Sequence, residues 1–177
     1  MTQAETIKAD AVRQVGSGHE AALRVENLHT HFFTRAGVVK AVNGVSFEIA
    51  RGEILGLVGE SGSGKSVTGF SVMGLIDPPG QIVEGQILHG GQDLTKLAPE
   101  DLRRIRGNRI AMIFQDPMMT LNPVLRVDTQ MVEAVLAHQK VDRAAALEMS
   151  QAALEQVGIP APERRLKAVS YTHLRAP

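Results

Sequence analysis

Cysteine is absent from this sequence, which excludes disulfide bonds and thiolate chemistry. The 19 basic residues balance the 19 acidic ones, so no overall charge favours nucleic acid or an anionic membrane surface as a partner. No stretch approaches the roughly 18 apolar residues of a membrane-spanning helix, and the polar N-terminus has no apolar segment typical of a signal peptide. A membrane role would therefore have to be peripheral.

The composition that remains is typical of a globular protein, with 44% hydrophobic and 21% charged residues in a chain of 177. We predict a mobile N-terminal lead-in over residues 1–20 and an α/β core over residues 21–124. Residues 125–167 have a helical composition and predict a separate helical subdomain. The last stretch, residues 168–177, fits neither pattern.

Two kinds of β-strand are predicted. Leu23, Val25 and Leu28, the segment from Val38 to Ile49, and the segment from Gln86 to His89 predict ordinary strands separated by turns. The continuous apolar run from Ile54 to Val58, and the run from Arg109 to Phe114, are typical of strands buried on both faces of a parallel sheet. The fold class is therefore α/β, a phosphate-loop core with a parallel sheet and an antiparallel β subdomain.

Apolar spacing and end signals predict the helices. Val67, Phe70 and Met73 recur at three-residue spacing and favour a helix that follows the glycine-rich segment after Val58 and ends before Asp77. Three further helices are expected: Pro99 to Ile105, Val127 to His138, and a helix capped by Asp142 that runs to Val157 and stops at Gly158.

The segment from Gly59 to Ser66, GESGSGKS, matches the phosphate-loop pattern G-x-x-x-x-G-K-[ST] at every fixed position. Gly59, Gly62 and Gly64 allow backbone N–H groups to converge on phosphate oxygens, and the following helix directs its positive end to the same anion. Lys65 supplies a positive charge to the terminal phosphates, and the Ser66 hydroxyl is placed for magnesium. The predicted cofactors are therefore ATP and Mg²⁺, with Glu60, Ser61, Ser63 and Val67 completing the binding segment.

Gln115 follows the second predicted parallel strand, at the sheet edge where ligands of doubly wound folds bind. An amide at this edge is able to contact both magnesium and an attacking water molecule. From residue type alone, a polar group hydrogen-bonded to a neighbouring loop is the simpler interpretation.

Three segments together resemble the ATP-binding subunits of ABC transporters, and within them the oligopeptide and dipeptide importers. These are the stretch from Ala41 to Phe47, the loop from Gly59 to Ser66, and IAMIFQDPMMTLNP from Ile110 to Pro123. The resemblance extends from about Leu23 to Lys167. It implies a peripheral subunit on the cytoplasmic face of the inner membrane that couples ATP hydrolysis to peptide import.

The resemblance also implies partners and residue roles. A second ATP-binding subunit, identical or different, would complete a dimer around two ATP molecules, integral membrane permease subunits would be driven by it, and an extracytoplasmic solute-binding protein would be an indirect partner. Gln115 would sense magnesium and the γ-phosphate, with Lys65 as the other catalytic residue. Phe33 is favoured to stack on adenine, although Phe32 and Phe33 as core residues are an equal alternative. No nucleic acid partner is expected.

The sequence departs from this family after the helical segment. An L-S-G-G-Q-like signature, a strand ending in Asp-Glu and a switch histidine do not occur in these 177 residues. The tail from Ala168 to Pro177 resembles a translated adapter, so we interpret the chain as a truncated gene product whose natural sequence ends near Lys167. We therefore expect ATP binding at best, and hydrolysis only in the full-length protein.

Other functions remain open on sequence alone. A small-molecule kinase shares the phosphate loop, but the segment from Ile110 to Pro123 argues against it. A non-catalytic nucleotide-binding module and a DNA-repair ATPase are further alternatives, and nickel or another small solute is possible in place of peptides. His29, His31, His89 and His138 lack the spacing of metal ligands, and the arginines between Arg103 and Arg109 are typical of a solvated helix face.

Overall fold

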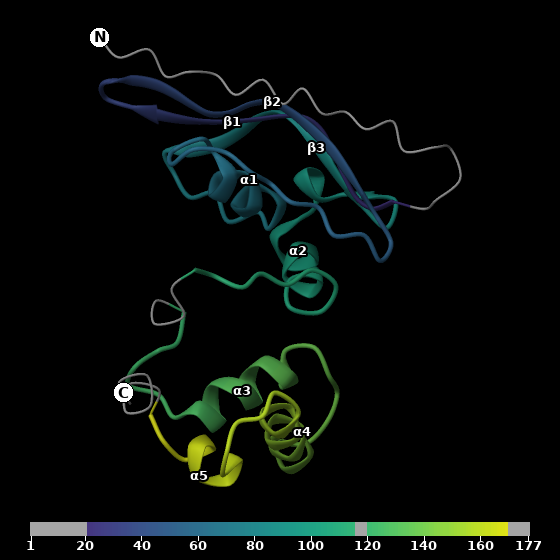
Figure 1. Cartoon of the computed structure of the whole chain (residues 1–177), viewed down its shortest axis with the longest axis vertical. Helices are drawn as coiled ribbons and strands as arrows, with labels where there is room; N and C mark the ends of the chain where they lie inside the picture. The colour runs from purple at the N-terminus through teal and green to yellow at the C-terminus, as the bar shows by residue number, and fades with distance from the viewer. Residues whose placement is uncertain (1–20, 116–119, 170–177) are drawn as a thin grey trace. The chain divides into compact units, whose positions relative to one another are not determined.

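The computed structural model describes residues 21–115 and 120–169, shown in colour in Figure 1. They belong to two compact units, the first ending at Arg103 and the second beginning at Arg104. The first unit holds the strands and the phosphate loop, and the second is helical. Each unit is described by itself.

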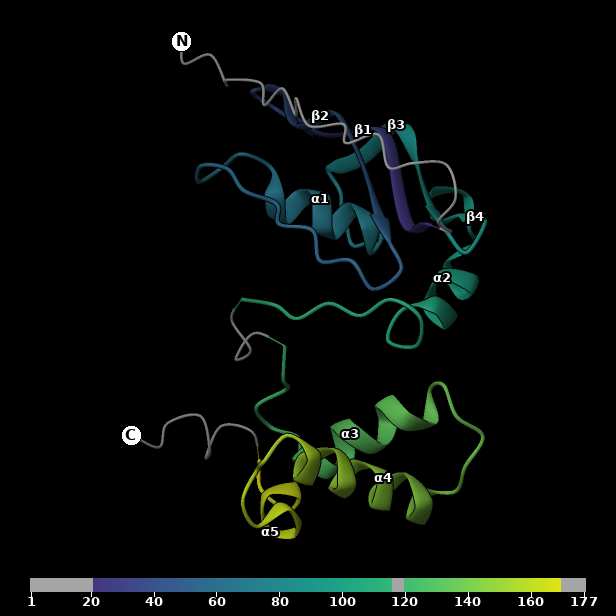
Figure 2. The same cartoon turned by 45° about the vertical axis from the view of Figure 1, so that its right-hand side comes forward.

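The described elements follow one another from an N-terminal β-rich part to a C-terminal helical part (Figure 2). In chain order they are β1 (Ala21–Thr34), β2 (Gly37–Ala50), α1 (Lys65–Val72), β3 (Gly80–His89), β4 (Gln92–Asp93), the 3₁₀-helix η1 (Leu94–Lys96), α2 (Pro99–Ile105), α3 (Val127–Leu136), α4 (Arg143–Gln156) and α5 (Pro162–Leu166).

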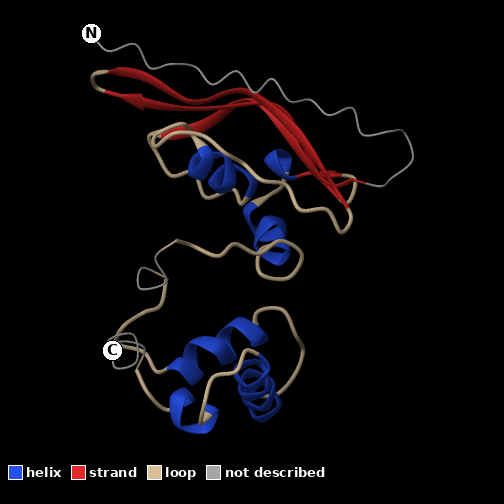
Figure 3. Ribbon diagram, in the orientation of Figure 1, coloured by secondary structure: helices blue, strands red, loops and turns tan. Residues whose placement is uncertain are grey.

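The four strands of the described residues, drawn red in Figure 3, form one antiparallel sheet. Their order in the sheet is β2-β1-β3-β4. Strand β1 is central, so its backbone groups pair with β2 on one edge and with β3 on the other. Register shifts interrupt both pairings near Asn27, which has a φ of 47°, and the short side chain of asparagine tolerates this left-handed conformation. The three strands predicted from the sequence are therefore confirmed, with β3 beginning several residues earlier than expected.

One face of this sheet carries helix α1. Val25 and Leu28 on β1 and Ile87 on β3 are 0 to 1% exposed and form the centre of the core. Figures 1 and 2 both show α1 lying against the sheet. Burial of one sheet face by an amphipathic helix is the usual way to cover an antiparallel sheet.

From residue 120 to residue 169, the described part of the second unit is built from the helices α3, α4 and α5. Helices α3, α4 and α5 pack against one another, and each contributes a buried apolar residue, Val132, Ala146 and Leu166 respectively. The Asp142 carboxylate accepts a hydrogen bond from the Ala145 backbone N–H at 2.8 Å, which confirms the predicted N-cap of α4. Gly158 follows the helix with a φ of 74°, as expected for a C-terminal stop.

The predicted parallel sheet is not formed by the described residues, and this part of the expectation is wrong for them. Residues 54–58 have no strand assignment, with Ile54 97% and Val58 91% exposed, and residues 111–114 likewise have none, with Ile113 98% exposed. A buried strand requires neighbours that satisfy its backbone N–H and C=O groups on both edges. Neither segment has such a neighbour in the sheet that the described residues form.

The boundary between the units also differs from the boundary after residue 124 drawn from composition, since the units divide after Arg103. The sequence predicts the segment that leads to Gln115 as a strand of the core sheet. Without that pairing it groups with the helical unit. At the other end, the Val127 N–H donates to the Ala168 carbonyl at 2.9 Å and Arg126 bridges to Val169, so the helical unit includes two residues beyond Lys167. Residues 1–20 and 170–177 lie outside the described residues.

Candidate nucleotide-binding site

The phosphate loop, residues 59–66, leads directly into helix α1. Gly62 and Gly64 have φ values of 82° and 88°, in the left-handed region that favours glycine. Gly64 is the N-cap of α1, so the first N–H groups of the helix lie at the end of the loop. The free N–H groups and the dipole of a helix N-terminus favour an anion at this position.

Lys65 folds back over the loop. Its ammonium group donates to the carbonyl oxygens of Gly59 at 2.7 Å and Glu60 at 2.6 Å, and to the Ser63 hydroxyl at 3.2 Å. The positive charge is therefore held in the curve of the loop, beside the N-terminus of α1. Two positive features at one place fit a phosphate group.

The loop glycines also permit close packing. A Cβ atom on Gly64 would lie 2.2 Å from the carbonyl oxygen of Ala41 on β2, and a Cβ atom on Gly59 would lie 2.6 Å from the Ser63 hydroxyl. The Thr68 hydroxyl and N–H both donate to the Gly64 carbonyl, at 3.0 and 2.8 Å. The end of the loop is therefore fixed against β2, which the sequence pattern did not indicate.

The other residues predicted to bind the cofactor lie along the same segment. Glu60, Ser61 and Ser66 are exposed, and Val67 is half-buried in the first turn of α1. The Ser66 side chain is thus accessible on the turn that also carries Lys65, where a hydroxyl is placed for a magnesium ion bound to a phosphate.

The two phenylalanines near the end of β1 lie on opposite faces. Leu28 and Thr30 on β1 are buried, and the Thr30 hydroxyl lies 2.8 Å from the Ser71 hydroxyl on α1. Phe32 shares their face, and its ring lies against Gly80, where an added Cβ would be 2.6 Å from its Cε1 atom. Phe33 is 46% exposed, and its N–H donates to the Pro79 carbonyl at 2.9 Å. The face of β1 that carries α1 therefore holds Phe32, and Phe33 lies on the opposite face.

Gln115 lies in the second unit, whereas the phosphate loop lies in the first. It is exposed and is the last described residue before position 120. Residues 59–67 and the two phenylalanines belong to the first unit, and Gln115 is described only in the second. Asp116, Pro117, Met118 and Met119, which follow it, lie outside the described residues.

Two histidines of the first unit, His29 and His89, take part in hydrogen bonds of the sheet. His29 contacts the side-chain oxygens of Asn43 at 3.0 Å and Asn27 at 3.1 Å, and the His89 Nδ1 donates to the Ala22 carbonyl at 2.7 Å. Desolvation, together with the charges of Lys40 and His29, lowers the pKa of His31 below 6.5. Within residues 21–115 and 120–169, no group of three or more His, Asp and Glu side chains is arranged to hold a metal ion.

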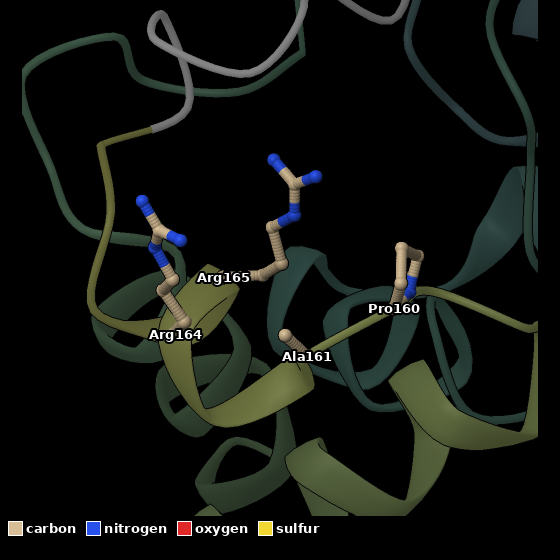
Figure 4. Close-up of a pocket in the computed structure, with 4 residues that line it drawn as sticks. All are labelled: Pro160, Ala161, Arg164 and Arg165. Carbon is tan, nitrogen blue, oxygen red and sulfur yellow. The ribbon is translucent and has the colours of Figure 1, made fainter.

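A separate pocket of about 200 Å³ lies in the helical unit (Figure 4). Pro160, Ala161, Arg164 and Arg165 line it, and Figure 4 shows both arginine side chains extending from α5. None of the residues predicted to bind nucleotide lines this pocket. The geometry of the phosphate loop, rather than this cavity, identifies the candidate site.

This combination defines the class of protein: a left-handed glycine loop leads into a helix, with a lysine folded into the loop. The ABC transporter family matches residues 42–174 of the chain. The chain belongs to this family. In the described part of the chain, no helix has the length and apolar character needed to cross a membrane.

Within the ABC transporter family, the chain is similar to ATP-binding proteins of peptide transport. The dipeptide transport ATP-binding protein of Bacillus subtilis is 48% identical over 155 residues, covering 87% of this chain and 46% of its own length. The oligopeptide transport ATP-binding protein of Escherichia coli is 42% identical over 154 residues, covering 87% and 45%. The chain thus spans about half the length of the curated relatives it matches.

Solved structures agree on the fold. A dimeric bacterial ABC transporter cassette has a TM-score of 0.71 at 19% identity, covering 85% of this chain and 62% of its own. An ATP-binding subunit of an ABC transporter has a TM-score of 0.61 at 26% identity, covering 84% of this chain and 54% of its own. The α/β cassette class predicted from the sequence is therefore confirmed, and family membership removes the small-molecule kinase alternative.

Proposed function

We propose that this chain contributes the phosphate-binding part of an ATP-binding subunit that drives peptide import through an ABC transporter. The observation that carries the proposal is the Lys65 ammonium group held between the Gly59 and Glu60 carbonyls, next to the N-terminus of α1. The names of the relatives, which specify dipeptide and oligopeptide transport, support the substrate class.

The loop residues suit the triphosphate of ATP. Backbone N–H groups of residues 59–66 bind phosphate oxygens, and Lys65 exchanges its carbonyl partners for the terminal phosphates. Ser66 and Gln115 are the proposed magnesium ligands. The ion would neutralise phosphate charge during transfer to water. This chain's own residues hold and orient the phosphates, and hydrolysis belongs to the full-length protein.

The proposed partners follow from the family. A second ATP-binding subunit, permease subunits in the membrane and, indirectly, an extracytoplasmic solute-binding protein would assemble with the full-length protein at the cytoplasmic face of the membrane. Formal neutrality, with 19 basic and 19 acidic residues, suits attachment through protein contacts rather than attraction to anionic lipid.

Substitution of Lys65 by Ala tests the phosphate site. We expect Mg-ATP affinity, measured by titration calorimetry, to fall by about 30-fold, or about 2 kcal/mol, because a charge-assisted phosphate contact is lost. Arg164→Ala, in the pocket of the helical unit, serves as the matched control and leaves affinity unchanged. Equal affinity of the unsubstituted chain and the Lys65→Ala variant would contradict the proposal.

The adenine contact has its own test. The sequence favours Phe33, whereas Phe32 is the phenylalanine whose ring lies against Gly80, on the face of β1 that carries α1. If Phe32 stacks on adenine, Phe32→Leu lowers ATP affinity by about three- to tenfold and Phe33→Leu does not, since base stacking contributes about 1 kcal/mol or more. If Phe33→Leu lowers ATP affinity and Phe32→Leu does not, Phe33 is the residue that stacks on adenine. Inorganic triphosphate, which has no base, should bind both variants equally.

A further inference from the structure

Helix α1 is joined to the antiparallel sheet by two buried hydroxyl groups outside the phosphate-loop pattern. Thr30 on β1 is 0% exposed and Ser71 on α1 is 2% exposed. Their hydroxyl oxygens lie 2.8 Å apart. We propose that Thr30 and Ser71 are positioning residues that hold the phosphate-loop helix in register with the sheet and thereby set nucleotide affinity. This inference rests on the nucleotide binding proposed above.

The direction of the hydrogen bonds follows from the number of hydrogens. The Ser71 hydroxyl donates to the Val67 carbonyl at 2.7 Å. A hydroxyl has one hydrogen, so the Thr30 hydroxyl is the donor in its bond with Ser71. The result is a continuous connection from the central strand β1 to the first turn of α1, two residues beyond Lys65.

A second connection holds the same turn from β2. The Thr68 hydroxyl, on a side chain that is 4% exposed, donates to the Gly64 carbonyl, and Gly64 packs closely against the Ala41 carbonyl. The segment that leads into the loop from the other side, residues 54–58, is largely exposed and unpaired in the sheet. In this chain the position of α1 is therefore determined from β1 and β2.

Small displacements of α1 matter for binding. The loop N–H groups and the Lys65 ammonium must reach phosphate oxygens at hydrogen-bond distance, and a site about 1 Å too loose loses much of its function. A buried hydroxyl pair has a directional bond, which fixes the helix along its axis, whereas apolar packing alone tolerates sliding.

Substitutions of these two hydroxyl groups allow an effect on nucleotide affinity to be distinguished from an effect on stability. Replacing both partners of a buried hydrogen bond with apolar groups of similar shape is nearly neutral for stability, whereas removing one acceptor leaves an unpaired donor. Ser71→Ala leaves the Thr30 hydroxyl without its acceptor, so it is expected to be the least stable variant. Thr30→Val combined with Ser71→Ala removes both groups and recovers stability.

The experiment measures Mg-ATP affinity by calorimetry and unfolding by urea for the whole chain. The variants are Thr30→Val, Ser71→Ala, their combination, Thr30→Ser, and Ile87→Val as a control that removes a buried methyl from the same sheet. We expect about fivefold weaker binding in both single variants and in the double variant, the factor of one lost hydrogen bond. Thr30→Ser retains the hydroxyl and binds as the unsubstituted chain does, while Ile87→Val loses stability without losing affinity.

The decisive result is the double variant, in which stability recovers while affinity stays reduced. Affinity that recovers together with stability, or that is unchanged in both single variants, would overturn the positioning role and leave the proposed function intact. An unsubstituted chain that does not bind Mg-ATP would overturn the proposed function, and with it the statement about affinity. The two failures are thus distinguished by the unsubstituted chain alone.

Discussion

Strand β1 and residues 54–58 are both apolar segments of the first unit, yet they end in opposite environments. Val25 and Leu28 on β1 are 0 to 1% exposed, and β1 is paired on both edges. Ile54 and Val58 are 97% and 91% exposed, although residues 54–58 contain no polar side chain. Apolar composition alone therefore does not decide burial.

The difference lies in where the pairing partners come from. Strand β1 finds β2 through a short hairpin, and it pairs on its other edge with β3, which follows α1 in the chain and lies within the described residues. A strand buried in a parallel sheet depends on neighbours brought by long crossover connections. The chain covers less than half of its curated relatives, and the residues described here supply no such neighbour to residues 54–58.

The largest effect is expected when a buried residue of β1 and an exposed residue of the segment 54–58 are each replaced by alanine and compared. Leu28→Ala should lower the free energy of unfolding by about 2 to 5 kcal/mol, because it leaves a cavity in the core. Val58→Ala should change it by less than about 0.5 kcal/mol, because the side chain is already in water. Urea unfolding followed by circular dichroism measures both.

A large loss of stability in Val58→Ala would break this comparison, since it would mean that residues 54–58 are buried in solution. Hydrogen exchange gives an independent check on the same point. The amides of β1 should be strongly protected and those of residues 54–58 should exchange at rates near those of an unfolded chain.

A smaller effect on stability is expected at Asp93, which lies on the edge strand β4. Asp93 accepts hydrogen bonds from the N–H groups of Ile87 and Thr95, at 3.3 and 3.1 Å, and pairs with Lys96 at 2.9 Å. Burial raises the pKa of Asp93, but the hydrogen bonds from Lys96, Thr95 and Ile87 outweigh it and hold the pKa below 3.8. We expect Asp93→Ala to cost about 1 to 2 kcal/mol at neutral pH.

The pH dependence has a definite sign. The folded-state pKa of Asp93 is lower than the unfolded one, so its stabilisation is present above about pH 4 and is lost as the pH falls through the folded value. The stability difference between the unsubstituted chain and Asp93→Ala should therefore shrink in acid. Glu100→Ala, which removes an exposed carboxylate from α2, is the control and should change little. A difference that stays constant down to pH 2 would show that Asp93 acts by packing alone.

Much of the site could be predicted because its signals are local. The glycines and lysine of residues 59–66 have a fixed spacing, and the loop conformation follows from the φ values that only glycine adopts readily, as Gly62 and Gly64 do. The helix ends at Asp142 and Gly158 are equally local. By contrast, the Ala41 carbonyl against Gly64, and the Thr30–Ser71 pair, join residues far apart in the chain and carry no motif.

The sequence by itself determined the phosphate loop, the positions of the antiparallel strands, most of the helices and the family, because each is recognised from patterns within short segments of the chain. Only the tertiary structure decided that Phe32 lies on the face of β1 that carries α1, that residues 54–58 and 111–114 stay unpaired, and that α1 is held from β1 and β2. The physical reason is that backbone pairing and buried hydrogen bonds require partners, and the position of a partner is a property of the folded chain.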